Sequence, residues 1–133
     1  MPAIATTEGD TLIANLLFKN ADVNRGTGLK LGLFTNSSVS ASTTYGALTQ
    51  PTGGGYAEIS LTDGSWSVAS GVASYAAQTF TVSGTTYSAA IYGYYIRTMG
   101  TSPKIITLQT DPAGPITFAI GDTYVITPNI TLS

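Results

Sequence analysis

The sequence predicts an all-β protein, a jelly-roll-like β-sandwich of about eight or nine strands with one short N-terminal helix. Three observations lead to this fold class. Apolar and polar residues alternate over short segments after residue 28, which is the period of a strand with one buried face. These segments recur at roughly ten-residue spacing, and polar turn residues separate them. An immunoglobulin-like sandwich fits the same strand count. The chain, residues 1–133, is expected to form a single domain.

Residues 1–28 are expected to form a helical arm. Thr7 and Asp10 fit a capping box, in which each side chain binds the backbone N–H of the other residue. Because a closed sandwich leaves no free sheet face, the helix is expected to dock outside its own sandwich, on another copy or on a partner. The alternative is that it closes the open end of its own sandwich. The apolar residues at one-turn spacing are Leu12, Ile13, Leu16 and Leu17.

The rest of the chain is expected to be strands and turns. The segment 89–98 is apolar on both faces, which predicts a central strand buried on both sides. Asp63-Gly64 predicts a hairpin turn, and residues 35–55 form a long polar loop. The expected strands are 29–33, 56–61, 66–68, 79–82, 89–98, 104–109, 116–120, 124–126 and 130–132. The expected core residues are Trp66, Phe80, Ile91, Phe118 and Ile126.

The charge pattern and the length of the apolar runs argue against nucleic-acid and membrane partners. The chain carries five basic and seven acidic residues, and the basic ones are scattered along it. Nucleic-acid binding needs clustered Lys and Arg, so no nucleic-acid partner is expected. No apolar run is long enough for a membrane helix, so no membrane partner is expected. The charged fraction of 9% is far below the usual quarter or so. This indicates either a surface covered by other subunits or a β protein that is simply rich in Ser and Thr.

The sequence offers little for catalysis, since it contains no histidine and no cysteine. Glu58 and Asp63 bracket a strand end and could form a glycosidase pair. However, Glu58 is expected to point to solvent, and Asp63 is explained by its turn. Ser102 and Lys104 could formally act as a Ser–Lys catalytic dyad, but they lie in a turn, where the base and the nucleophile are not expected to touch. We therefore expect no enzyme, no catalytic residue, no metal site and no cofactor.

The aromatic residues allow two interpretations. Tyr92, Tyr94 and Tyr95 lie close together on one predicted strand, with Trp66 and Tyr75 upstream. Such a row could stack sugars, but Tyr and Trp are more often core or subunit-interface residues. The expected assembly interface therefore combines the sheet with the helix. Its residues are Leu12, Ile13, Leu16, Leu17, Tyr92 and Tyr94.

Several motifs, taken in order, resemble small virion structural proteins of tailed bacteriophages. The segment 29–36 is similar to the opening strand of these proteins, and Tyr56-Ala57 followed by Trp66 is similar to a glycine-tyrosine-alanine strand with a downstream tryptophan. The segment 91–96 resembles their long central strand, and 118–124 with the ending 128–132 resembles their C-terminal hairpin. The 35–55 loop departs from the pattern because it lacks acidic residues.

The resemblance implies a structural role in a virion. The expected function is that of a capsid cement (decoration) protein, a homotrimer that binds the major capsid protein on the outer capsid surface and stabilises the shell. The alternative is a tail fibre, baseplate or host-glycan-binding adhesion module of the virion.

Overall fold

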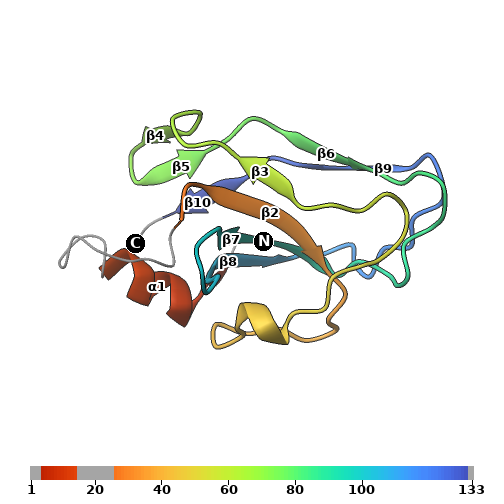
Figure 1. Cartoon of the computed structure of the whole chain (residues 1–133), viewed down its shortest axis with the longest axis horizontal. Coiled ribbons are helices and arrows are strands. Elements are labelled where there is room, and N and C mark those ends of the chain that lie inside the picture. Colours follow the sequence, from red (N-terminus) through yellow and green to blue (C-terminus); the bar gives the residue numbers. More distant parts are fainter. Residues whose placement is uncertain (1–3, 15–25, 132–133) are drawn as a thin grey trace.

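The fold is an all-β sandwich, as the sequence predicts, and a computed structural model describes residues 4–14 and 26–131 of it. One layer is a five-stranded antiparallel sheet. The other layer consists of a three-stranded sheet and a two-stranded ribbon, and Figure 1 shows it running along the top of the view. One short helix, α1 (Thr7–Ala14), and a 3-10 turn, η2 (Tyr45–Ala47), complete the described elements.

The five-stranded sheet has the order β1-β8-β7-β2-β3. Its long strands are β2, β7 and β8, and the two edge strands are short. The 89–98 segment supplies the middle strand, β7, so the prediction of a central strand is confirmed. The bounds are β1 Ile4–Ala5, β2 Leu29–Phe34, β3 Ile59–Leu61, β7 Gly93–Thr98 and β8 Ile105–Thr110.

In the second layer, the two-stranded and three-stranded sheets run on from each other as one bent antiparallel ribbon, and β4 is the extra strand at its edge. The ribbon pairs β6 with β9 and then β5 with β10. Between these two pairs, the Tyr75 N–H donates to the Pro128 carbonyl at 3.0 Å. The register shifts by one residue at Ala76-Ala77, which is a β-bulge that bends the ribbon. The bounds are β4 Ser67–Ala69, β5 Val72–Ser74, β6 Gln78–Thr81, β9 Thr123–Ile126 and β10 Asn129–Thr131.

The main core lies between the two layers. The alternating leucines of β2 face the ribbon, and their strand neighbours Lys30 and Gly32 face the other way. Four of the five expected core residues are buried in it: Phe80, Ile91, Phe118 and Ile126. The fifth, Trp66, is half-buried at its margin and contacts Tyr75 edge-to-face, with 5.1 Å between ring centroids.

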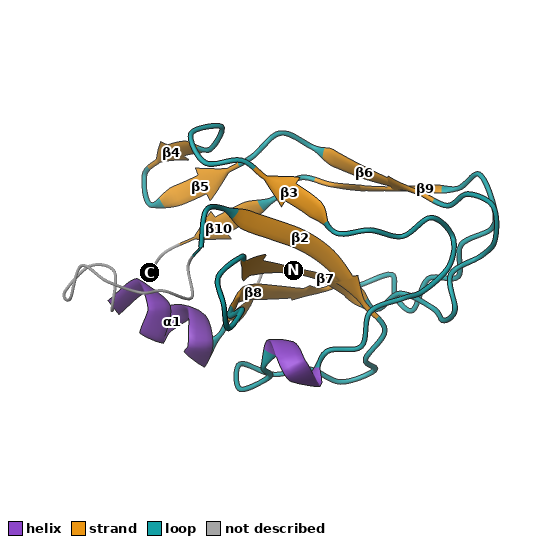
Figure 2. Ribbon diagram, in the orientation of Figure 1, coloured by secondary structure: helices purple, strands orange, loops and turns teal. Residues whose placement is uncertain are grey.

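A second, smaller core lies on the opposite face of the five-stranded sheet. Its buried residues are Phe34, Tyr95, Ile105 and Leu108. Gly32 lies opposite Tyr95 on β2, and the absence of a side chain there makes room for the phenol ring. Residues 35–55, which we call the cover loop, fold back over this core. Figure 2 shows η2 as the short helix below β7 and β8. The side chains of Val39, Tyr45 and Leu48 pack against the smaller core.

The N-terminal segment differs from the expected arm. Its first described residues form β1, which pairs with β8 as a strand of the sheet. The predicted capping box is wrong, because Thr7 lies inside the helix and Thr6 caps it. The Thr6 hydroxyl oxygen accepts a hydrogen bond from the Gly9 N–H at 2.9 Å, and the hydroxyl donates to the Ile105 carbonyl. The start of α1 is therefore fixed to β8 of its own chain.

Two turn predictions also differ. The strands that flank Asp63-Gly64 belong to different sheets, so this turn carries the chain from one layer to the other rather than closing a hairpin. The hairpin is instead β4–β5, closed at Ser70-Gly71, where both residues have positive φ. The expected strand 116–120 is reduced to one bridge between Ile91 and Ile116, because its other residues form no ladder.

Candidate functional site

The most concentrated polar site lies on the outer face of the five-stranded sheet, where it meets the cover loop. The Glu58 carboxylate accepts hydrogen bonds from Arg97 Nε at 2.7 Å and Arg97 Nη2 at 2.6 Å. It also accepts one from the Tyr95 hydroxyl at 2.6 Å. The Arg97 guanidinium lies over the Tyr45 ring, 4.7 Å from its centroid. We call Glu58, Tyr95, Arg97 and Tyr45 the Glu58 cluster.

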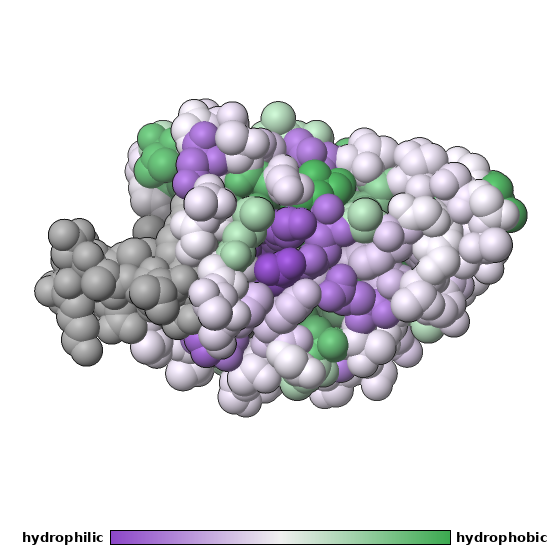
Figure 3. All heavy atoms as spheres, viewed as in Figure 1, coloured by the Kyte–Doolittle hydropathy of each residue, from purple (hydrophilic) through white to green (hydrophobic). Residues whose placement is uncertain are grey.

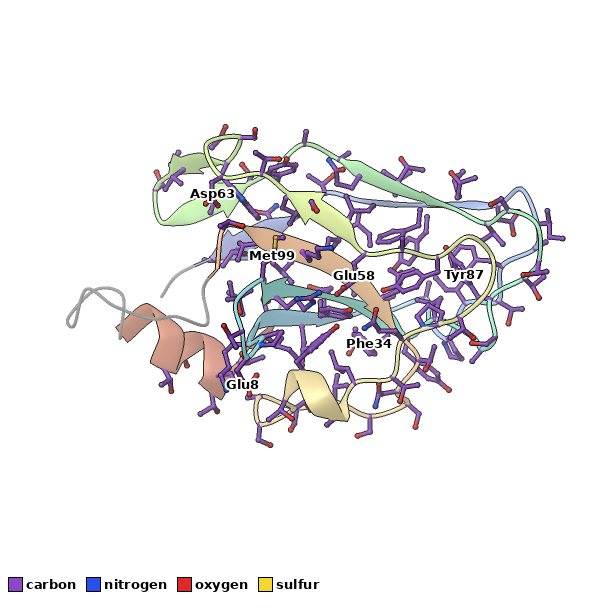
Figure 4. All side chains as sticks on the ribbon, in the orientation of Figure 1. Glu8, Phe34, Glu58, Asp63, Tyr87 and Met99 are labelled. Carbon is purple, nitrogen blue, oxygen red and sulfur yellow. The ribbon has the colours of Figure 1, made fainter. Side chains whose placement is uncertain are left out.

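The cluster corrects the expectation that Glu58 points to solvent. Glu58 does lie on the face opposite the main core, but the cover loop makes that face partly buried, and the carboxylate side chain is only 11% exposed. Figure 4 shows Glu58 over the middle of the sheet. Figure 3 shows strongly hydrophilic atoms gathered in the same part of the view, over β2 and β3.

The electrostatics of the cluster argue against acid–base chemistry. Burial opposes ionisation of Glu58, but the hydrogen bonds from Arg97 and Tyr95 outweigh it and lower the pKa of the carboxyl. A general acid needs a raised pKa, and a nucleophile needs a free oxygen. Both oxygens of Glu58 are occupied. The cluster is therefore suited to holding the loop rather than to catalysis.

A hydrogen-bonded chain of neutral groups extends the cluster along the loop. The Leu33 N–H has no partner on β3, and it donates to the Tyr56 hydroxyl at 3.0 Å. Tyr56 donates to Gln50 Oε1 at 3.0 Å, and Gln50 Nε2 donates to the Tyr45 hydroxyl at 2.9 Å. Tyr56 thus satisfies a strand N–H and links it to the loop.

These buried tyrosines predict a loss of stability at high pH. Burial raises the pKa of Tyr56 to about 12, and burial together with the Tyr56 and Glu58 charges raises the pKa of Tyr95 as well. The unfolded chain therefore ionises first. Urea unfolding should show constant stability between about pH 6 and pH 9. Between about pH 10 and 12 the free energy of unfolding should fall by about 1.4 kcal/mol per pH unit for each tyrosine that is held neutral in the folded state.

Tyr56→Phe supplies the control for this expectation. It removes one ionisable group, so its stability should decline less steeply over the same alkaline range. Equal slopes for the variant and the parent chain would show that Tyr56 is not held neutral in the folded state.

The other residues considered for chemistry do not assemble into a site. Figure 4 shows Asp63 near β4, apart from Glu58, so the two carboxylates do not form a pair. The Lys104 ammonium lies 3.7 Å from Glu8 Oε1, and Ser102 is exposed. Across residues 4–14 and 26–131, no three His, Cys, Asp or Glu side chains form a group that could hold a metal ion. No helix within these same ranges is long and apolar enough to cross a membrane.

The expected assembly residues are not brought together where the structure describes them. Tyr94 packs against the main core, whereas Tyr92, just before β7, packs against the smaller core on the other face of the sheet. The three neighbouring tyrosines therefore do not form one exposed row. Leu16 and Leu17 lie outside the described residues, and the description of α1 side chains ends before Leu12 and Ile13.

A second candidate surface is the outer face of the ribbon layer. None of its five strands contains a charged residue. Phe80, Tyr124 and Ile130 point into the main core, so their strand neighbours point outward, and these are exposed or half-buried. We call this the uncharged face. Its residues are Ser67, Ala69, Val72, Ser74, Thr79, Thr81, Thr123, Val125, Thr127, Asn129 and Thr131.

Comparison of the chain with protein-family models, with curated proteins and with solved structures found no match. The functional assignment therefore depends on the site geometry and on the motifs described above.

Proposed function

We propose that this chain is a capsid cement (decoration) protein of a tailed bacteriophage. In this role it binds the major capsid protein on the outer capsid surface, acts as a homotrimer and stabilises the shell. The observation that carries the proposal is the uncharged face of the ribbon layer. The order of motifs that resembles small phage virion proteins supports the same function.

The physical argument concerns the cost of removing water from a docking surface. A charge buried at an interface loses its hydration and must be paired, whereas Ser and Thr hydroxyls can exchange bonds with water for bonds with a partner. Interface centres are accordingly depleted of charged residues. Charged side chains of this protein's strands occur in the other layer, at Lys30 and Arg97. One layer is therefore suited to close contact with a large protein surface.

Placing charges on the uncharged face should abolish binding to the shell while leaving the fold intact. Thr79 and Thr123 are exposed on neighbouring strands of the ribbon, so Thr79→Glu with Thr123→Glu adds two carboxylates without touching the core. We expect co-sedimentation with capsids that lack the protein to fall about tenfold or more, because one unpaired buried charge costs over 1.4 kcal/mol.

The matched control is Ser60→Glu, an exposed strand residue of the other layer that lies opposite Lys30. It should bind like the parent chain, and urea unfolding should show that all three proteins are folded. Unimpaired binding by the Thr79/Thr123 variant would exclude the uncharged face as the docking surface.

The copy number in purified particles separates the cement role from the alternative. A cement protein should be present in numbers comparable to the major capsid protein, as quantitative mass spectrometry would measure. A tail fibre, baseplate or adhesion module should be present in far fewer copies. Sedimentation equilibrium of the purified chain tests the trimer.

A further inference from the structure

The cover loop is attached to the sheet by two kinds of contact. Apolar side chains from the loop pack on the smaller core, and Tyr45 contacts Tyr95 and Arg97 of β7. Within the loop, the Thr35 N–H donates to the Thr49 carbonyl at 2.8 Å.

The loop also bonds the helix, through the Thr7 N–H and the Ala41 carbonyl at 2.9 Å. The C-terminal end of the loop is also bonded to the 83–88 segment, for example through the Ser88 N–H and the Thr52 carbonyl at 2.9 Å. Residues 36–50 of the loop are exposed or half-buried.

Tyr45 is the loop residue on which the polar contacts converge. Its ring touches Tyr95 edge-to-face, with 5.8 Å between centroids, and it lies beneath the Arg97 guanidinium. Arg97 is in turn oriented by both oxygens of Glu58. A cation over an aromatic face is effective only when its position is fixed. Glu58 therefore acts on the loop through Arg97, although Glu58 itself precedes β3.

We propose that the Glu58 cluster is an acid-sensitive contact between the cover loop and the five-stranded sheet. Protonation of Glu58 releases the loop from the sheet while the sandwich stays folded. A protonated carboxyl cannot accept the charge-assisted pair of bonds from Arg97. Arg97 then loses its fixed position over Tyr45. Loop residues detach, and the smaller core around Phe34 and Leu108 becomes accessible to solvent.

The groups around Glu58 set the direction of this switch. Arg97 and Tyr95 on β7 and Lys30 on β2 all favour its ionised form, and they outweigh burial so that the pKa of Glu58 lies below its usual value of 4.5. Tyr56 beside Glu58 stays neutral at acid pH, because burial raises its pKa to about 12. A group with a lowered pKa contributes stability that is lost as pH falls through its folded value. Release is therefore expected below pH 4.5.

Hydrogen exchange of single amides tests the proposal on the full chain. At neutral pH, Glu58→Gln mimics the protonated state with little change of shape. We expect the hydrogen-bonded loop amides of Thr35, Leu48 and Thr49 to exchange about tenfold faster or more, as loss of 1.4 kcal/mol would give. The amides of Ile91 and Thr98, which lie in the sandwich, should keep their protection.

Two further measurements keep the test decisive. Asp111→Asn is the matched control, because Asp111 also accepts a tyrosine hydroxyl, from Tyr124 at 2.6 Å, but Tyr124 belongs to β9 of the second layer. It should leave the loop amides unchanged. Second, the parent chain titrated downward from pH 4.5 should begin to bind a hydrophobic dye while near-ultraviolet circular dichroism still reports a packed core.

Either of two results would overturn the proposal. One is an unchanged exchange rate at the loop amides of Glu58→Gln. The other is simultaneous loss of protection in the loop and the sandwich, in the variant or in the parent chain at acid pH, since that describes global unfolding without a separate release step.

Discussion

Truncating Phe80 or Phe118 to Ala should lower the free energy of unfolding by about 3–5 kcal/mol each. Both side chains are at least nine-tenths buried in the main core. Phe80 comes from β6, and its ring stacks on Tyr56, with 6.0 Å between centroids. Phe118 touches the rings of Tyr87 and Tyr124. Each truncation removes aromatic contacts and leaves a cavity that rigid neighbours on both layers cannot fill.

Val125→Ala is the matched control for this pair. It also shortens an apolar side chain on a strand of the ribbon, but Val125 is 59% exposed on the uncharged face. Its cost should stay below about 1 kcal/mol, because little apolar area returns to water. Urea unfolding of the three variants measures all of these values. Costs below 1 kcal/mol for both phenylalanines would show that the core is assigned to the wrong strand faces.

Gly93→Ala should destabilise the protein by about 3 kcal/mol or more. Gly93 begins the central strand β7, between β2 and β8. A methyl group there would collide with the Gln109 carbonyl oxygen on β8 and lie 2.9 Å from Phe34 Cζ. The obstacle on β8 is backbone, so relief requires the two strands to separate and lose ladder hydrogen bonds.

Gly46→Ala isolates this steric effect from the general effect of removing a glycine. A methyl group at Gly46 would meet no atom within 4 Å. Because alanine loses less conformational entropy on folding, this change should be neutral or stabilising by up to about 1 kcal/mol. Equal thermal unfolding midpoints for the two variants would contradict the expected collision at Gly93.

The strands were largely predictable because local alternation determines which face is buried. β2 and β7 follow their patterns, and Phe80, Ile91, Phe118 and Ile126 occupy the main core as expected. The helix cap was misplaced by one residue because Thr6 and Thr7 are equivalent as local signals. The contact that selects Thr6 comes from Ile105, which is 99 residues further along the chain.

The Glu58 cluster was not predictable from strand periodicity. Alternation correctly placed Glu58 on the face opposite the main core, but it cannot show that a loop covers this face. The partner Arg97 is 39 residues away in the sequence. A usable signal was the presence of Val39, Tyr45 and Leu48 in a segment otherwise rich in Ser, Thr and Gly. Apolar residues at such spacing in a long loop indicate that the loop packs on something.

The antiparallel ribbon affects how this chain can fold as it is synthesised. The five-stranded sheet is complete once β8 has been made, but β5 and β6 pair with β10 and β9, which are synthesised after β8. Until then the second layer is incomplete, and the inner leucines of β2 lack the core-facing residues that β9 and β10 supply. Domains generally fold as units, and exposed apolar strands are prone to aggregate. The nascent chain is therefore most vulnerable to aggregation before β9 and β10 emerge.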